Sequence, residues 1–237
     1  MALDQALLGR ATRGEHWLRL YRWEPACLSF GRHESALRRY DRQRIAALGL
    51  AVVRRPTGGR AVWHAREITY ALAMPAPAAG GIRSACLEIH RMLRDALRTL
   101  GIEAGLAPDA VTPPLDAGAC FARPVGGEIL VGGRKVVGSA QLRESGALLQ
   151  HGSILLEDDQ HLVRAVTRGH APDDGAAPPA RLTGRRLAPD LLARAVAGTA
   201  AARWGGHWAE VERAPELVAE AGEHLPRFLA DEWTWRA

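Results

Sequence analysis

The alternation of hydrophobic and polar positions predicts strands over most of the first two thirds of the chain. Hydrophobic residues are interspersed with charged ones from His16 to Trp23, and Ala26 to Phe30 is a second short apolar run. Both patterns are typical of β-strands. Further strands are predicted at 50–54, 61–63, 67–74 and 148–156, and a hairpin that turns at Gly132-Gly133 is predicted over 128–142.

Helical spacing dominates the last third and occurs twice before it. The earlier helices are predicted at 39–48 and 84–100, and the later ones at 158–168, 188–203 and 215–221. The Pro- and Gly-rich segments 108–127 and 170–179 show no periodicity and predict loops. We therefore expect an α+β fold with a mainly antiparallel sheet flanked by helices. A single domain over 1–237 is expected, strand-rich over 1–157 and helical over 158–237.

Composition indicates where in the cell we expect the protein to be found. Hydrophobic residues make up 47% of the 237 positions, but none of the apolar runs approaches the ~20 residues needed to cross a bilayer. The first ten residues are amphipathic and include an acid, unlike a signal peptide. We expect a cytoplasmic protein without membrane association, and a monomer.

The net charge of +5 favours acidic partners. Arginines are scattered along the chain and do not interleave with aromatic residues, so a nucleic-acid surface is not expected. An acidic protein partner fits the charge.

The three cysteines, Cys27, Cys86 and Cys120, are too few and too far apart for a disulfide framework or a CxxC zinc site. Cys27 and Cys86 occupy apolar patterns, as small core residues do. Cys120 lies in the irregular 108–127 segment, where reactive side chains are commonly found. A nucleophilic thiol requires a neighbouring cation or base.

The densest motif is the segment from Arg54 to His64, with paired glycines between two predicted strands. Gly58 and Gly59 allow the backbone to approach a ligand closely, and the flanking arginines suit an anionic or strongly polar group. A tight hairpin with solvated arginines is the simpler alternative. The segment is not a P-loop, because a strand follows it and it lacks the Lys-Ser or Lys-Thr pair.

Lys135 is the only lysine of the chain, and every other non-histidine basic residue is an arginine. This usage indicates either chance or a position that requires a compact ammonium group able to shift its pKa. Lys135 precedes Val136 and Val137 on a predicted strand, where it acts as a base or polarises a carbonyl group, or else points to solvent.

His151 precedes Gly152 within a strand, a context that also fits a core histidine. His64 and His151 lack an HExxH motif and a carboxylate at ligand spacing, so we expect no metal site.

Three motifs together resemble the biotin/lipoate protein ligase and octanoyltransferase superfamily. Residues 55–64 resemble its RRxxGGxAVxH segment, residues 135–141 its KxxGSAQ strand, and residues 150–153 its QHGS strand. The opening strands at 20–31 and the closing Asp231-Glu232-Trp233 also match, so the resemblance covers nearly the whole chain in order. It implies the superfamily's biotinyl/lipoyl-transferase fold, which is like that of class II synthetases.

Within that superfamily the chain is more similar to cysteine-type octanoyltransferases. Cys120-Phe121 stands where those enzymes have Cys-Phe, and arginine follows the glycine pair. Gly127-Glu128 replaces the Asn-Asp pair of lipoate ligases, and Ala65 replaces the acidic residue that often follows the histidine.

The resemblance implies transfer of an octanoyl group through a thioester on Cys120, aided by Lys135. The implied donor is octanoyl-acyl carrier protein and the implied acceptor is a lysine of a lipoyl domain, such as that of glycine cleavage H protein. No cofactor is expected, whereas a ligase would use ATP and Mg. The implied substrate-binding residues are Arg55, Thr57, Gly58, Gly59, Arg60, Ala61, His64, Gly138, Ser139, Ala140, Gln141, His151 and Gly152.

Three alternatives remain open from the sequence. These are an ATP-dependent lipoate ligase, an amidotransferase that moves lipoyl or octanoyl groups between carrier proteins, and a non-catalytic module that binds acyl groups or carrier proteins.

Overall fold

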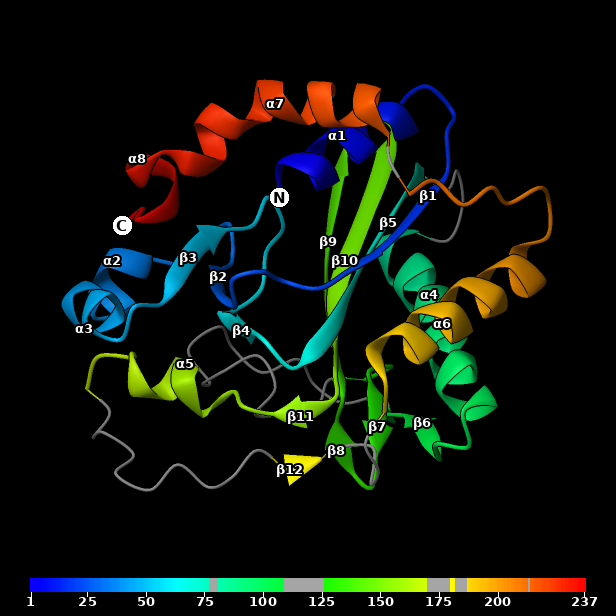
Figure 1. Cartoon of the computed structure of the whole chain (residues 1–237), viewed down its shortest axis with the longest axis horizontal. Helices are drawn as coiled ribbons and strands as arrows, with labels where there is room; N and C mark the ends of the chain where they lie inside the picture. Colours follow the sequence, from blue (N-terminus) through cyan, green and yellow to red (C-terminus); the bar gives the residue numbers. More distant parts are fainter. Residues whose placement is uncertain (77–80, 109–125, 170–179, 182–186, 213) are drawn as a thin grey trace.

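A four-stranded antiparallel sheet forms the centre of the molecule (Figure 1). The computed structural model describes residues 1–76, 81–108, 126–169, 180–181, 187–212 and 214–237. The strand order is β1-β5-β10-β9, and each neighbouring pair is antiparallel. The strands are β1 (Trp17–Tyr21), β5 (Glu67–Pro75), β10 (Ala147–Leu155) and β9 (Val137–Glu144).

Helices cover both faces of this sheet (Figure 1). On one face α1 (Ala2–Ala11) packs directly on β5 and β10, and α7 (Pro215–Leu229) packs on α1. On the other face lie α4 (Gly81–Thr99) and α6 (Pro189–Trp204). Because side chains alternate along each strand, β5 contributes Ile68, Tyr70 and Leu72 to the α4 side and Ala71 and Ala73 to the α1 side.

A three-stranded sheet of order β3-β2-β4 lies beside the central one. Its strands are β3 (Ala51–Arg54), β2 (Cys27–Phe30) and β4 (Val62–His64), and β2 runs parallel to β3 and antiparallel to β4. The segment between β3 and β4 therefore crosses over β2 and is not a hairpin, which removes the simpler interpretation of the glycine motif.

Short elements complete the fold. Around the small sheet lie α2 (Ala36–Arg39), α3 (Arg42–Ala47), α5 (His161–Ala165) and α8 (Asp231–Thr234). A second three-stranded sheet contains β6 (Ala104–Leu106), β7 (Ile129–Val131) and β8 (Arg134–Lys135), and β11 (Glu157–Asp158) pairs with β12 (Ala180–Arg181).

The prediction of a mainly antiparallel α+β fold is confirmed, and the differences are local. The helix predicted over 39–48 is two helices, because the Asp41 side chain accepts hydrogen bonds from the backbone N–H groups of Gln43 and Arg44 and starts α3 anew. The predicted hairpin ends near Val136, whose N–H still donates to the Ile129 carbonyl on β7, and from Val137 onward the chain pairs with β10. Helix α7 continues to Leu229, eight residues beyond the predicted end.

Candidate functional site

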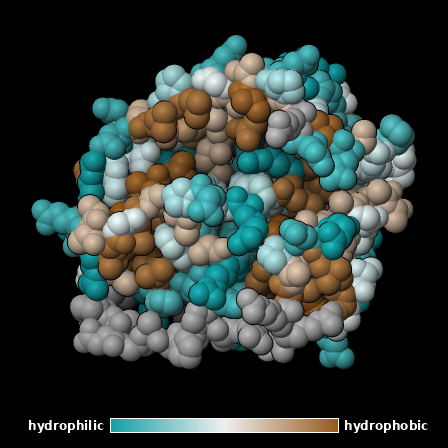
Figure 2. Space-filling model, viewed as in Figure 1, coloured by the Kyte–Doolittle hydropathy of each residue, from teal (hydrophilic) through white to brown (hydrophobic). Residues whose placement is uncertain are grey.

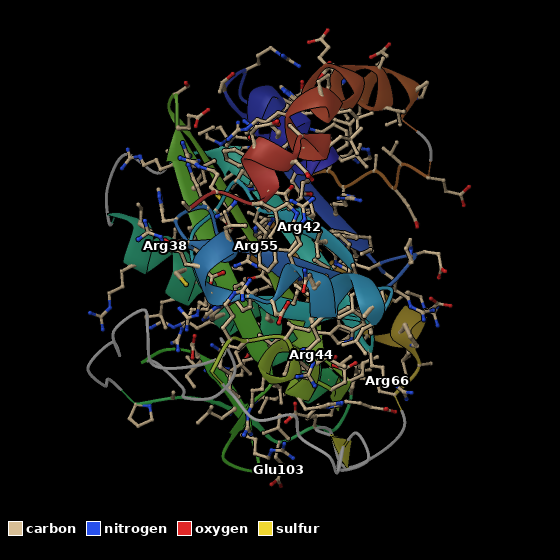
Figure 3. All side chains as sticks on the ribbon, turned by 90° about the vertical axis from the view of Figure 1, so that its left-hand side faces the viewer. Arg38, Arg42, Arg44, Arg55, Arg66 and Glu103 are labelled. Carbon is tan, nitrogen blue, oxygen red and sulfur yellow. The ribbon has the colours of Figure 1, made fainter. Side chains whose placement is uncertain are left out.

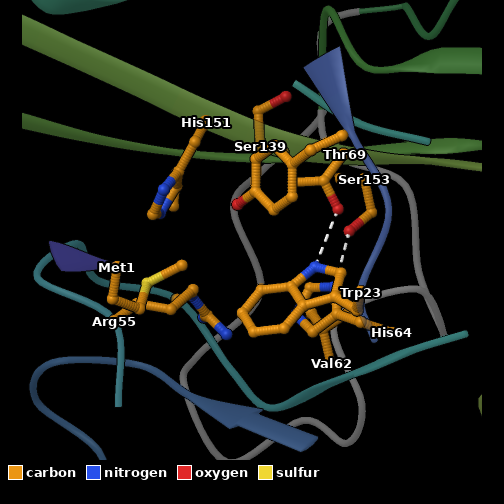
Figure 4. Close-up of a pocket in the computed structure, with 14 residues that line it drawn as sticks. Met1, Trp23, Arg55, Val62, His64, Thr69, Ser139, His151 and Ser153 are labelled. Atoms are coloured by element: carbon orange, nitrogen blue, oxygen red, sulfur yellow. Dashed lines mark hydrogen bonds between the residues drawn. The ribbon is translucent and has the colours of Figure 1, made fainter. Parts of the chain in front are cut away.

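A pocket of about 400 Å³, counting its open mouth, lies on the α1 side of the central sheet (Figure 4). Strands β1, β5, β9 and β10 form one wall, and β4 with the preceding glycine loop forms the opposite wall. The lining residues are Met1, Tyr21, Trp23, Arg55, Gly59, Val62, His64, Thr69, Gly138, Ser139, Ala140, His151, Gly152 and Ser153.

The register of the strands places lining residues from different strands side by side in the sheet wall of the pocket. Thr69 on β5 lies opposite Tyr21 on β1 and Ser153 on β10, and Ser153 lies opposite Gly138 on β9. Residues directly opposite each other in antiparallel strands share a face of the sheet. The motifs around 138–141 and 150–153 therefore meet although they stand on different strands.

Glycines at two places allow backbone to pack against backbone. A Cβ added to Gly31 would lie 1.8 Å from the carbonyl oxygen of Gly59, and one added to Gly152 would lie 2.3 Å from that of Gly138. Gly59 also has a φ of +92°, which favours glycine. Any larger residue at Gly31 or Gly152 would displace a wall of the pocket.

Arg55 holds the glycine loop in place. Its guanidinium donates to the carbonyl oxygens of Gly58 and Arg60, at 3.1 and 2.9 Å, and to the carbonyl and hydroxyl oxygens of Ser29, at 3.0 and 2.6 Å. The side chain is buried and lines the pocket. The solvated arginines of the hairpin alternative are thus excluded for Arg54, Arg55 and Arg60, all of which are buried.

His64 lies at the β4 side of the pocket in a cluster of hydrogen bonds. Its Nδ1 lies 2.7 Å from Oε1 of Glu67, and because a carboxylate oxygen only accepts, Nδ1 is the donor. The Ser29 hydroxyl, which already accepts from Arg55, donates to Nε2 of His64 at 2.5 Å. Trp23 stacks on the imidazole at 4.7 Å and donates to Thr69 at 2.9 Å (Figure 4).

His151 lies on the sheet wall in a second cluster of the same kind. Its Nδ1 donates to Oδ2 of Asp4 at 2.9 Å, and its Nε2 accepts from the Thr57 hydroxyl at 2.6 Å. Burial lowers the pKa of His151, with Asp4 opposing that shift, so the imidazole is neutral at pH 7. Asp4 is itself fully buried and forms an ion pair with Arg19 at 2.8 Å.

Ser139 also belongs to a hydrogen-bond chain on the α4 side. Its hydroxyl donates to Nε2 of His90 at 2.8 Å and accepts from Tyr70 at 2.6 Å. His90 donates from Nδ1 to the carbonyl oxygen of Gly127, and burial lowers its pKa. Gln150 donates to Tyr70 and accepts from Gln141, so donation runs in one direction from Gln141 to the carbonyl oxygen of Gly127. This chain fixes the β9 wall from behind.

Lys135 is buried, and its ammonium donates to Oε1 of Glu128 at 2.7 Å. The interpretation of Lys135 as a solvent-facing strand lysine is therefore wrong. Glu128 is one of the two residues that replace the Asn-Asp pair of ligases, and here it pairs with the lysine. Lys135 is three residues before Gly138 on the adjoining strand and does not line the pocket.

The structure brings together most of the predicted binding residues. Those that line the pocket are Arg55, Gly59, His64, Gly138, Ser139, Ala140, His151 and Gly152. Thr57, Gly58, Arg60, Ala61 and Gln141 stand behind that lining, where Thr57 contacts His151 and Gln141 contacts Gln150. Cys120 lies outside the described residues.

Several lining positions lie outside the predicted set of binding residues. Met1, Tyr21, Trp23 and Val62 give the pocket its apolar lining, and Thr69 and Ser153 add hydroxyl groups. Asp4 and Glu67 supply the carboxylates of the two histidine clusters. The alternation of hydrophobic and polar residues in the first strands predicts which side chains are buried. It does not predict which of those side chains contact a histidine.

The other two cysteines have the character of core thiols. Burial raises the pKa of Cys27 to about 12 and the pKa of Cys86 to about 11, so both are protonated at pH 7. Within the described ranges, His, Cys, Asp and Glu side chains do not gather in threes that suit a metal ion, and none of the helices is long and apolar enough to cross a membrane.

Comparison of the sequence with known proteins gives the family of the chain. Residues 1–186 match the family model of the lipoyl protein ligase A/B catalytic domain. An octanoyltransferase LipM from Kyrpidia tusciae is 36% identical over all of this chain and 93% of its own length. A LipM from Exiguobacterium sibiricum is 41% identical over 68% of this chain and 62% of its own length.

Solved structures share the fold at lower identity. A lipoate-protein ligase A bound with ATP superposes with a TM-score of 0.80 at 21% identity, covering 98% of this chain and 91% of its own. A putative lipoate protein ligase from T. acidophilum with bound lipoic acid gives 0.77 at 20% identity, with coverage of 99% and 92%. The protein therefore belongs to the lipoyl protein ligase A/B catalytic-domain family.

Proposed function

We propose that this protein is an octanoyltransferase of protein lipoylation that carries the acyl group on Cys120. The observation that supports it most is the pocket, where apolar side chains and the three family motifs share one lining. Relatives at 36% to 42% identity are named octanoyltransferase LipM. We further propose that the pocket holds the octanoyl chain against Tyr21, Trp23 and Val62.

The proposed transfer has two steps. The Cys120 thiolate attacks the carbonyl carbon of an octanoyl thioester, the carbon–sulfur bond to the donor breaks, and the donor leaves as a thiol after taking up a proton. The ε-amine of an acceptor lysine then attacks the new thioester. The bond to Cys120 breaks as the amide forms, and the amine proton goes to the departing thiolate. Both thioesters are already activated, so the route consumes no ATP.

Groups around the pocket support parts of this chemistry. The pair of Lys135 with Glu128 places a buried cation beside β9, where it favours a thiolate or an oxyanion over the neutral group. Gly138 and Ser139 lie in the lining, and the backbone N–H of Ser139, which the register leaves out of the pairing with β10, would serve as a donor to the oxyanion. His64 and His151 have both ring nitrogens engaged, so they position the walls and do not act as free bases.

We infer that the donor is octanoyl-acyl carrier protein and the acceptor is a lipoyl-domain lysine. A carrier-bound thioester supplies the activated acyl group that the route needs without a nucleotide. One of the structural neighbours of this chain belongs to a lipoylation system described with its E2 lipoyl domain. The net charge of +5 favours acidic carrier proteins of both kinds.

Intact-protein mass spectrometry after incubation with octanoyl-acyl carrier protein tests the proposal. We expect a gain of one octanoyl group in the wild type, loss of that adduct in Cys120→Ala, and its retention in the matched control Cys86→Ala. Transfer to a lipoyl domain should fall at least 1000-fold in Cys120→Ser, with unchanged circular dichroism.

Three other outcomes would contradict the proposal. Lipoylation that requires ATP, without a protein adduct, would indicate a ligase. An adduct formed only from an octanoylated or lipoylated carrier protein, and not from acyl carrier protein, would indicate an amidotransferase. Binding without turnover would indicate a non-catalytic module.

A further inference from the structure

Polar and apolar groups are mixed over the surface of the described residues. On the face that Figure 2 shows, hydrophobic residues form separate patches that hydrophilic residues divide. Figure 3 shows several labelled arginines spread across the side view: Arg38, Arg42, Arg44 and Arg66. Of these, Arg42 already pairs with Asp231. The unusual polar group lies inside the molecule, on α4.

His90 is a polar residue on the buried face of α4. It is 3% exposed, and the other buried residues of this helix are apolar: Ile89, Met92, Leu93, Ala96 and Leu97. A buried polar side chain lowers stability unless it is hydrogen-bonded. Both ring nitrogens of His90 are bonded, one to Gly127 and the other to Ser139. We call this three-residue connection the His90 bridge.

The hydrogen bonds of the His90 bridge have a defined direction. The carbonyl oxygen of Gly127 only accepts, so Nδ1 carries the proton and donates at 2.8 Å. Burial lowers the pKa of His90. The ring is therefore neutral at pH 7, and its Nε2 accepts from the Ser139 hydroxyl at 2.8 Å. The Cys86 thiol lies 3.8 Å from the same nitrogen and is a weaker donor.

One end of the His90 bridge fixes the partner of the lysine. The N–H of Gly127 donates to the Ala107 carbonyl at 2.9 Å, and the N–H of Ala107 donates to the Glu128 carbonyl at 2.7 Å. His90 adds a bond to the Gly127 carbonyl, so the peptide between Gly127 and Glu128 is held from two sides. The Glu128 carboxylate extends from that peptide, and its Oε1 lies 2.7 Å from the Lys135 ammonium.

The other end of the bridge restrains Ser139 on the outer strand of the central sheet. Strand β9 is last in the strand order. The Leu155 N–H donates to the Val136 carbonyl, and bonded pairs alternate with non-bonded pairs along an antiparallel ladder. By this alternation Ser139 and Gly152 form a non-bonded pair, so the Ser139 N–H points away from β10. Because β10 does not hold that peptide, the side-chain hydrogen bonds on the α4 side restrain it.

We propose that His90 is a positioning residue for the acyl transfer, because it sets the placement of the Lys135 ammonium relative to the Ser139 N–H. In the proposed reaction the ammonium favours the thiolate, and the N–H binds the oxyanion. His90 does not line the pocket and acts only through the groups that it holds. This inference rests on the proposed function and adds a residue outside the three motifs.

Three substitutions at His90 separate its two hydrogen bonds. Asparagine places an amide nitrogen near Nδ1 and keeps a donor for Gly127, glutamine places an amide oxygen near Nε2 and keeps an acceptor for Ser139, and alanine removes both. With octanoyl-acyl carrier protein and a lipoyl domain, we expect kcat to fall about 10-fold in His90→Asn and His90→Gln, and about 100-fold in His90→Ala, the scale of a displacement of about 1 Å. KM for both substrates should stay within about twofold of wild type, because the substrate contacts are unchanged.

A double-mutant cycle tests whether Ser139 transmits the effect. In a Ser139→Ala background, His90→Asn should lower kcat by less than about twofold, because the bond that it removes is already absent. His90→Gln should keep its effect in that background, since it acts through Gly127. Additive losses from His90→Asn and Ser139→Ala would overturn the proposal.

Lys135 provides a readout that does not depend on turnover. It is the only lysine of the chain, so protein labelled with isotopic lysine gives a single side-chain signal in NMR spectra. His90→Gln and His90→Ala should shift this signal because the restraint on Glu128 is lost, whereas His90→Asn should leave it near its wild-type position. Met92→Ala is the matched control. It removes a fully buried side chain from the same helix face and lowers stability, but it should change neither the Lys135 signal nor kcat.

The asparagine and glutamine variants decide the proposal if His90→Ala does not fold. Unchanged kcat in them would overturn it. An equal loss of kcat in Met92→Ala, or a rise in KM in place of the loss in kcat, would also overturn it. If the wild type transfers no octanoyl group, the proposed function fails and the Lys135 signal decides the bridge. A shift in His90→Gln but not in Met92→Ala then supports it, and an unshifted signal overturns it.

Discussion

The two histidine clusters beside the pocket have the same hydrogen-bond order but different charge. In each, Nδ1 donates to a buried carboxylate and Nε2 accepts from a hydroxyl, with Asp4, His151 and Thr57 in one. Glu67, His64 and Ser29 form the other. Each cluster links a motif on one wall to a residue outside the motifs.

The carboxylates differ in what surrounds them. Asp4 pairs with Arg19, and its bonds to His151 and nearby cations outweigh burial and lower its pKa. Glu67 has no arginine or lysine within ion-pair distance among the described residues, and its Oε2 is buried without a hydrogen-bond partner. The comparison teaches that one hydrogen-bond geometry occurs in two settings: a buried ion pair under α1, and beneath Trp23 a carboxylate that has no arginine or lysine partner in the described part of the chain.

The largest expected effect is on stability, and it distinguishes Asp4, which forms an ion pair with Arg19, from Glu67, which forms no such pair among the described residues. Asp4→Asn leaves Arg19, whose side chain is 26% exposed, without its anion and weakens the buried bond to His151, so we expect the free energy of unfolding to fall by about 3 to 4 kcal/mol. Glu67→Gln removes no ion pair to a permanent cation and keeps an acceptor for His64, so we expect about 1 kcal/mol. Urea denaturation at pH 7 measures both.

Equal losses in the two variants would contradict the distinction. A circular dichroism spectrum of each variant in buffer serves as the control for folding. Asp4→Asn should also weaken octanoyl transfer more than Glu67→Gln at 25 °C, because α1 anchors the His151 wall.

The two clusters also show which residues of the site could be predicted from the sequence and which could not. Each of the motifs at 55–64, 135–141 and 150–153 is a continuous run of residues, so a linear pattern finds its histidines and glycines. Asp4 meets His151 across 147 positions of the chain, and local periodicity carries no information about such a contact.

Helix α1 was missed for a related reason. Its buried residues lie on all sides of the helix and include Ala2, Asp4, Leu7, Leu8 and Ala11. We expected the first ten residues to be amphipathic but assigned no helix to them, whereas α1, enclosed between the sheet and α7, lacks the polar face of an amphipathic helix. The four strands of the central sheet, in contrast, were predicted to within a few residues, because their hydrophobic residues follow local patterns.

An intermediate effect comes from Asp159, a buried neighbour of the Glu67 cluster. Burial, followed by the charge of Glu67, raises the pKa of Asp159 from 3.8 to about 6. The folded state therefore favours the protonated acid. That stabilisation is complete below pH 3.8 and is lost as pH rises through 6.

Asp159→Asn should remove this dependence. We expect the variant to exceed the wild type in free energy of unfolding by about 2 to 3 kcal/mol at pH 8, since one pKa unit corresponds to about 1.4 kcal/mol. The difference should shrink toward zero near pH 4. Thermal or urea unfolding from pH 4 to 8 measures it, and a constant difference across this range would refute the assignment.

The smallest expected effect compares the hydroxyl groups of the two clusters. Ser29 is fully buried, and its oxygen accepts from Arg55 at 2.6 Å while its hydrogen reaches His64 at 2.5 Å. Among the described residues, the Thr57 hydroxyl bonds His151 alone, at 2.6 Å.

Ser29→Ala should therefore lower the free energy of unfolding by about 2 kcal/mol and Thr57→Val by about 1 kcal/mol, because a hydrogen bond to a charged group is worth more than a neutral one. Denaturant unfolding at pH 7 provides both values, with Thr99→Val on α4, whose hydroxyl bonds only the Ala96 carbonyl within its own helix, as the control. A larger loss in Thr57→Val than in Ser29→Ala would show that Arg55 does not depend on Ser29, and would assign the glycine loop's placement to the His151 cluster instead.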